Sequence, residues 1–161
     1  MAIANVNDLM VQALGEVYDA EHQFLEGQQE MEQQATDQDL KSSIQQHISD
    51  TEQQIRNLEQ VFEQLDQQPQ RQTNEVAQGL VSEAQQNMQA AENEAIRDCA
   101  IIAAVIKVEH FEMGAYRGLV TGAQQMGQNE IANLLSENMQ QEEQTAQIAE
   151  QSAPDLFQKA G

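Results

Sequence analysis

The sequence predicts an all-α protein, and three observations support this prediction. The 161 residues include only two prolines and eight glycines, and aromatic residues make up 4% of the chain. Alanine, leucine, glutamate and glutamine, which favour helices, are abundant, whereas the aromatic residues that favour strands are few. Apolar residues recur every three or four positions, which is the period of a helix with one buried face.

The first two helices are expected to follow each other closely. Helical spacing of apolar residues extends from about Asn7 to Ala35. Thr36, with Asp39 three residues later, resembles a capping box that begins the second helix. That helix is expected to end before Pro69, because proline cannot continue a helix without losing a backbone hydrogen bond.

Three more helices are predicted in the rest of the chain. Thr73 is a candidate cap for a short helix that extends to about Met88. The most apolar helix follows, over residues 93–126, and Gly127 is expected to terminate it. Asn129 is the predicted cap of a last helix, which should end before Pro154.

The lengths of these segments predict a bundle. The first two and the last two helices are joined by a few residues, so each pair should form an antiparallel hairpin. A four-helix bundle with one long crossover, here containing the short helix, is the ferritin-like architecture. We predict it as a single domain over residues 1–161, because no change in composition marks a second one. The alternatives are an elongated bundle without a site and a coiled coil; sustained heptads, which a coiled coil needs, are absent.

Each long predicted helix carries polar side chains in its apolar stripe, close to its midpoint. Antiparallel helices of similar length bring their midpoints to one level, so these side chains should meet in one layer. Carboxylates and an imidazole in such a layer match a site for two iron or manganese ions, whose charge would offset the buried negative charge. The candidate ligands are Glu21, His47, Asp50, Glu109, Glu112 and Glu142.

Several alternatives remain open at this stage. Glu143 could replace Glu142 if the last helix is rotated, and His22 and His110 point about 100° away from the proposed ligands beside them. The bundle could also lack metal, with glutamates that are protonated or that bond to three hydroxyl groups; these belong to Thr51, Tyr116 and Thr145.

The net charge of −20 limits the possible partners. Asp and Glu number 27 against seven Lys and Arg, and no basic cluster exists, so nucleic acid and anionic membranes are disfavoured. No apolar run reaches the ~20 residues of a membrane span, and the first ten residues do not resemble a secretory signal. The single cysteine, Cys99, is compatible with a reducing cytoplasm, which is the predicted location.

Four stretches carry a resemblance to a known family. They are "VYDAEHQFL" (17–25), "QHISDTEQQIRNLEQVFEQL" (46–65), "AAVIKVEHFEMGAY" (103–116) and "QQEEQTAQIAE" (140–150). In their order and spacing the chain resembles the YciE/YciF-like stress-response proteins, a bacterial branch of the ferritin-like superfamily. The resemblance covers nearly the whole chain and implies a rubrerythrin-related di-metal bundle that pairs as a dimer.

The resemblance also implies a set of metal ligands. Glu21, His47, Glu109, Glu112 and one of Glu142 and Glu143 correspond to the metal-binding positions of the family. Asp50 stands where a glutamate is expected, and its shorter side chain would hold one metal position weakly or through water. With one histidine the site is rich in oxygen, which leaves iron, manganese or adventitious zinc open.

Two classes of function follow. In the first, two iron ions react with peroxide or oxygen and protect the cell under oxidative stress; whether the chain is an enzyme is left open. The alternative is a non-catalytic metal-binding protein, or a structural stress protein whose bundle is stapled by metal. A homodimer is expected, with the apolar face of the short crossover helix as a suitable contact.

Overall fold

The computed structural model describes residues 3–161, and in this range it contains five helices and no strand. The predicted all-α class is therefore confirmed. The helices are α1 (Val6–Gln34), α2 (Gln38–Gln64), α3 (Glu75–Ala90), α4 (Glu94–Gln125) and α5 (Asn129–Ala160).

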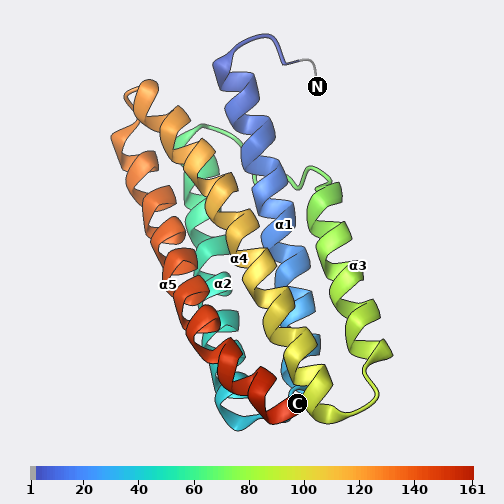
Figure 1. Ribbon diagram of the computed structural model, residues 1–161. Helices are drawn as coiled ribbons and strands as arrows, with labels where there is room; N and C mark the ends of the chain where they lie inside the picture. Colours follow the sequence, from blue (N-terminus) through green and yellow to red (C-terminus); the bar gives the residue numbers. More distant parts are fainter. Residues whose placement is uncertain (1–2) are drawn as a thin grey trace.

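The helices form two antiparallel hairpins that pack against each other (Figure 1). α1 pairs with α2 and α4 pairs with α5, while α1 also packs on α4 and α2 on α5. The short helix α3 runs back along the bundle and lies against α1 and α4, so it covers one side of the four-helix core (Figure 1). This is the predicted bundle with one long crossover.

The cap of α2 differs from the prediction. Asp37, and not Thr36, is the cap: its side chain accepts hydrogen bonds from the backbone N–H groups of Asp39 and Leu40, each at 3.1 Å. Thr36 instead donates its hydroxyl to Asp98 at 2.7 Å. The predicted capping box was wrong because a carboxylate from α4 binds the threonine.

The cap of α3 also lies one residue from the predicted one. Asn74, and not Thr73, accepts a hydrogen bond from the N–H of Ala77 at 3.0 Å. The crossover that leads to this cap passes close over α1, where the N–H of Gln72 donates to the carbonyl of Gly15 at 3.0 Å. A Cβ atom at Gly15 would lie 2.5 Å from Cγ of Gln72, so the glycine allows this approach.

The predicted end of the last helix was wrong. Pro154 lies inside α5, which continues to Ala160, and Asn129 is its first residue, after a cap position at Gln128 that makes no side-chain hydrogen bond. A proline within a helix costs about 3 kcal/mol. The last turns nevertheless bury Leu156 in the same hydrophobic cluster as Cys99, and this packing offsets the cost.

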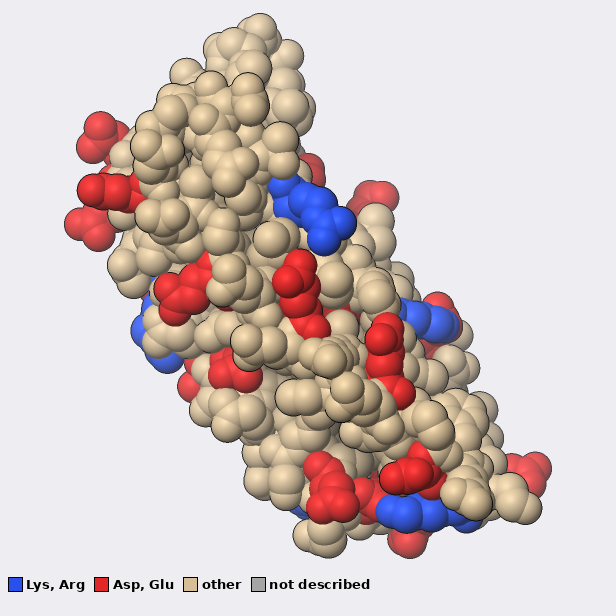
Figure 2. Space-filling view, turned by 60° about the vertical axis from the view of Figure 1, so that its left-hand side comes forward, with Lys and Arg blue, Asp and Glu red and all other residues tan. Residues whose placement is uncertain are grey.

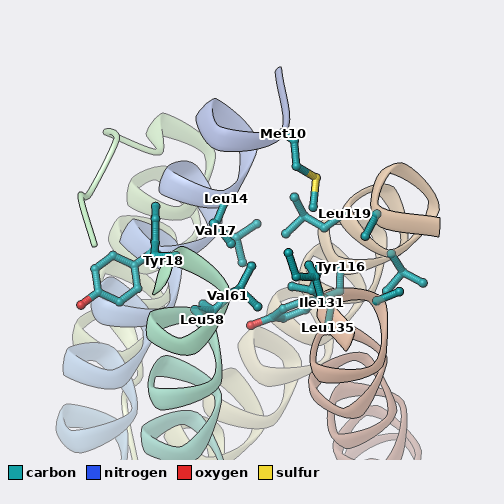
Figure 3. Packing of buried hydrophobic residues seen from close by; sticks show 14 of the residues in the cluster. Met10, Leu14, Val17, Tyr18, Leu58, Val61, Tyr116, Leu119, Ile131 and Leu135 are labelled. Carbon is teal, nitrogen blue, oxygen red and sulfur yellow. The ribbon is translucent and has the colours of Figure 1, made fainter. Parts of the chain in front are cut away.

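Two hydrophobic clusters occupy the two ends of the bundle. One contains Leu14, Leu58, Leu119 and Leu135, and Figure 3 shows part of it. The other contains residues from the opposite ends of the same long helices, among them Met31, Ile44, Ile101 and Leu156. On each long helix the proposed ligands lie in the sequence between residues of the two clusters, which places them at mid-height.

The crossover helix uses its apolar side within its own chain. Ala77, Ala84 and Met88 of α3 are buried, while Val76 is 58% exposed. The face that was expected to suit a dimer contact is therefore mostly covered already.

The surface is acidic but its charge is dispersed. Figure 2 shows one face on which acidic side chains are scattered among uncharged ones, with a few separate basic side chains. Within residues 3–161, no helix is both long enough and apolar enough to cross a membrane.

Candidate metal centre

Five of the proposed ligands are buried in the middle of the bundle. Glu21, Glu109 and Glu142 are fully buried, Glu112 is 2% exposed and His47 is 4% exposed. They come from all four long helices, because each helix places its polar residue in the stripe that faces the others. The structure thus brings together the predicted layer.

Four of these side chains form a compact group. One donor atom from each of His47, Glu109, Glu112 and Glu142 lies within 4.8 Å of the other three. His47 Nε2 is 3.2 Å from Glu109 Oε1 and 3.9 Å from Glu142 Oε2. Ligands of one metal ion lie about 2.0–2.2 Å from it, so small side-chain movements would let these atoms share an ion.

Glu21 borders this group and is held from the other side. The hydroxyl of Tyr116 donates a hydrogen bond to Glu21 Oε1, and it accepts one from the amide of Asn138 at 3.0 Å. In Figure 3 the Tyr116 hydroxyl points into the space between the helices, unlike that of Tyr18. Burial raises the pKa values of Glu109 and Glu112, and the charge of Glu21 contributes to the increase together with that of Glu142, as expected for neighbouring carboxylates.

The carboxylates of the layer have too few partners. Six buried oxygens make no hydrogen bond to the described residues: one each of Glu21 and Glu142, and both of Glu109 and of Glu112. Buried polar groups are normally hydrogen-bonded, and exceptions need an explanation. Four carboxylates and an imidazole with free oxygens have the donor chemistry that iron and manganese bind, so these residues fit a metal centre.

The electrostatics of the layer favour neutral carboxyl groups unless cations are present. Burial raises the pKa values of Glu109 and Glu112, and the charge of Glu142 raises them further. The pKa of Glu21 is also raised by burial and by Glu142, although the Tyr116 hydroxyl opposes the shift. Burial raises the pKa of Glu142 to about 7 despite hydrogen bonds that lower it. Near neutral pH, protons and metal ions therefore compete for binding to these carboxylates.

His47 is suited to bind a cation. Burial lowers its pKa to about 4, so the imidazole is neutral at physiological pH, as a metal ligand must be. Its Nε2 lies 3.2 Å from the amide nitrogen of Gln28, which can only donate. Nε2 therefore carries a lone pair, and an oxygen of Glu109 lies 3.2 Å from it. A metal ion bound at Nε2 would take the place of the Gln28 amide on that lone pair.

The remaining two candidate ligands lie outside the compact group. Asp50 is half-buried and accepts a hydrogen bond from Gln46 at 3.0 Å. Its charge nevertheless raises the pKa values of Glu109 and Glu142, so it borders the layer. Glu143 is exposed and pairs with Arg117 at 3.6 Å, which leaves Glu142 as the inward-facing residue of the two. A ligand role for each of the seven residues stays a prediction.

The other histidines point away from the layer, in line with the prediction. His110 is exposed and lies 2.8 Å from Glu150. His22 packs edge-on against the ring of Tyr18, with centroids 4.7 Å apart, and the Tyr18 hydroxyl donates to Glu59.

The expected hydroxyl partners of the glutamates are only partly present. Tyr116 bonds to Glu21. Thr51 accepts its hydrogen bond from Gln28 at 3.0 Å, and Thr145 donates to the carbonyl of Gln141 at 3.1 Å. Neither threonine therefore satisfies a carboxylate of the layer.

A set of buried amides around the layer was not predicted from the sequence. Gln28 bonds to Thr51 and approaches His47, and Gln54 donates to Glu142 Oε1. Asn57 donates to Asn138 at 2.7 Å. These residues also follow the apolar stripes, but in a chain rich in glutamine an amide in a stripe is a weak signal.

Comparison with known proteins identifies relatives that match this chain over most of its length. The model of the family described as "Domain of unknown function (DUF892)" matches residues 5–160. Protein YciF from Escherichia coli (strain K12) is 31% identical over 146 residues, which cover 90% of this chain and 88% of that protein.

Solved structures agree with this relationship. The crystal structure of the E. coli stress protein YciF matches with a TM-score of 0.92 at 28% identity, over 98% of this chain and 99% of that one. YcfI from Rhodopseudomonas palustris matches with a TM-score of 0.90 at 30% identity, over 92% of this chain and 94% of that one. A protein from Xanthomonas campestris, at 22% identity and a TM-score of 0.73, shares the fold. The predicted resemblance and the ferritin-like bundle are confirmed.

Proposed function

Because the chain belongs to the DUF892 family and resembles the stress protein YciF along nearly its whole length, we propose that it is a stress-response protein whose buried carboxylate layer binds two divalent metal ions. Iron is the first candidate, manganese the second, and zinc would be adventitious. The observation that carries the proposal is the set of six buried carboxylate oxygens without a hydrogen bond to the described residues.

The charge of the layer supports two ions over one. Four carboxylates lie together in a space from which water is excluded, namely Glu21, Glu109, Glu112 and Glu142. Ionised and unpaired they would be very costly to bury. Two divalent ions carry four positive charges, which would balance all four carboxylates while the neutral imidazole of His47 completes the ligand set.

The proposed reaction is the reduction of peroxide or oxygen. Bound as Fe²⁺, a pair of ions would supply two electrons, which with two protons would reduce one hydrogen peroxide molecule to two water molecules, or one dioxygen molecule to one hydrogen peroxide molecule. Two surrounding residues have positioning roles: Tyr116 orients Glu21, and Gln54 orients Glu142. The Gln28 amide, which lies 3.2 Å from His47 Nε2, would move aside when that nitrogen binds metal. The two hydrophobic clusters exclude bulk water from both ends of the layer.

Metal content tests this proposal. Untagged protein, purified without chelator from cells given iron and manganese, would be measured by plasma mass spectrometry. We expect about two ions per chain in the wild type and in Glu143→Gln, because Glu143 faces solvent. Glu109→Gln should lose most of the metal. Equal metal in Glu109→Gln and the wild type would contradict the proposal, and repeated Fe²⁺ oxidation on adding peroxide would support an enzyme.

A second role is favoured by the position of the layer. Its members come from α1, α2, α4 and α5, so a bound metal would join all four long helices. Non-catalytic metal binding that links the four long helices would raise the unfolding temperature strongly without turnover. If bound iron raises the unfolding temperature but peroxide oxidises each bound Fe²⁺ ion only once, without further turnover, the result would favour this role over an enzyme.

Assembly and location stay predictions. A homodimer is tested by sedimentation equilibrium, in which a mass of one chain would contradict it. A cytoplasmic location is tested by fractionation of the cells that make the protein.

A further inference from the structure

A small cavity adjoins the carboxylate layer beneath the crossover helix. It lies between α1, α3 and α4 and has a volume of about 20 Å³. His47 and Glu109 form part of its wall, so the cavity reaches the layer. The rest of the wall is mostly apolar and includes Phe24, Val81 and Val105, and three further polar residues also line it, namely Gln28, Glu30 and Gln85.

The size and the wall of this cavity select its occupant. A volume of roughly 10–15 Å³ suffices for one water-sized molecule, so the cavity has room for a single small molecule. Apolar cavities stay dry and bind apolar gases, because water inside them lacks hydrogen-bond partners. An uncharged diatomic molecule fits such a wall better than a charged or strongly hydrated reagent.

A polar contact lies at the outer side of the cavity. Gln85 of α3 donates to Glu30 Oε2 of α1 at 2.8 Å, and both residues are half-buried and line the cavity. On the inner side, Ala84 and Met88 of α3 are buried against the bundle. The crossover helix therefore acts as the cover of the cavity, with a polar rim outside and an apolar wall inside.

We propose that this cavity is the binding and entry site for dioxygen at the metal layer. The inference rests on the proposed function and makes it more specific: the oxidant that the fold admits is dioxygen, and hydrogen peroxide is disfavoured by the mostly apolar wall. The cavity also gives α3 a role, which is to shield His47 and Glu109 from water while leaving space for the gas.

Gly27 offers a mild way to fill the cavity. It lines the cavity, and a Cβ atom added there would meet only Val81, at 3.7 and 3.9 Å, which is ordinary contact. Gly27→Ala should therefore fold and reduce the free space. Gly118→Ala is the matched control, because it makes the same change in a helix, at an exposed position with no atom within 4 Å of the new Cβ.

Xenon binding to the metal-free protein is the first measurement, by ¹²⁹Xe NMR and by diffraction from crystals under xenon pressure. We expect one xenon atom in the cavity of the wild type and of Gly118→Ala, and much weaker binding in Gly27→Ala. A wild type without xenon in this cavity, or a Gly27→Ala variant that binds xenon equally well, would overturn the proposal. This readout does not depend on bound metal.

Stopped-flow oxidation of the Fe²⁺-loaded protein is the second measurement. Gly27→Ala should slow oxidation by dioxygen several-fold and leave oxidation by hydrogen peroxide nearly unchanged, whereas Gly118→Ala should affect neither. Equal slowing with both oxidants would overturn the assignment to dioxygen. A protein that binds xenon but no iron would contradict the proposed function, and with it this inference; one that binds iron but no xenon would contradict only this inference.

Discussion

Asp98 and Glu109 lie on the same helix, about three turns apart, and both are buried, at 4% and 0% exposure. Asp98 accepts three hydrogen bonds, from the N–H and hydroxyl of Thr36 and from the N–H of Asp37. Glu109 accepts none from the described residues. The difference separates two uses of a buried carboxylate: one joins α4 to the α1–α2 loop, and the other is free to bind a ligand.

The same contrast appears on α1. Asp19 accepts hydrogen bonds from Arg71 at 2.7 Å and from the N–H of Asn74 at 2.8 Å. Burial opposes ionisation of Asp19, but these bonds hold its pKa below the usual value. Two residues later, burial and the charge of Glu142 raise the pKa of Glu21. The pKa values of two neighbouring carboxyl groups on one helix are thus shifted in opposite directions by their surroundings.

Removing the structural carboxylate should have the largest effect on stability. Asp98→Ala leaves two backbone N–H groups and a hydroxyl without their acceptor, which should lower the free energy of unfolding by about 3 kcal/mol. Urea denaturation checks the value, and metal content should not change. If Asp98→Ala lost metal but kept its stability, Asp98 would have the ligand-binding role that is assigned to Glu109, and the comparison would be wrong.

The pH dependence of the metal-free protein should be the next largest effect. The folded-state pKa values of the four glutamates exceed the unfolded values, so their contribution to stability is present at low pH. This contribution is lost as the pH rises to the folded-state pKa values, and for Glu142 that pKa is about 7. Between the unfolded value of about 4.3 and this folded value, the free energy of unfolding should fall by about 1.4 kcal/mol per pH unit for each proton that the folded protein keeps and the unfolded chain has lost.

Urea titrations at several pH values measure this slope. Glu142→Gln, which cannot ionise, should show a smaller slope than the wild type, and added metal should reverse the trend because metal ions displace the protons. A metal-free stability that stays constant across this range, or that rises with pH, would contradict the raised pKa values.

Loss of the Tyr116 hydroxyl should have a smaller effect. Tyr116→Phe removes the hydrogen bond to Glu21 and leaves the Asn138 amide without that acceptor. We expect a loss of about 1–2 kcal/mol in stability. Calorimetric titration should also show weaker metal binding, because Glu21 is no longer oriented. Unchanged metal affinity would restrict Tyr116 to a packing role.

Glu143→Gln should have the smallest effect. The side chain is exposed and its ion pair with Arg117 spans 3.6 Å, so the change in stability should stay within about 0.5 kcal/mol. Thermal unfolding of the variant and the wild type, each with and without metal, checks this. If metal no longer raised the unfolding temperature of Glu143→Gln, the ligand would be Glu143 and not Glu142.

The sequence predicts the buried layer better than its surroundings, for a physical reason. Glu21, His47, Glu109, Glu112 and Glu142 follow apolar residues at helical spacing, and this periodicity alone determines which side of a helix is buried. The cap at Asp37 and the continuation of α5 through Pro154 depend on tertiary contacts, with Asp98 and around Leu156. The cavity beneath α3 depends on where the crossover packs, which no local pattern encodes.

Anomalous diffraction from crystals loaded with iron or manganese tests the central claim most directly. Data collected on both sides of the metal absorption edge should show two peaks within the layer, bordered by His47 and the four buried glutamates. Crystals of Asp98→Ala that are loaded in the same way should show both peaks. Peaks only at surface carboxylates, or an empty layer with its glutamates bonded to each other and to water, would contradict the account.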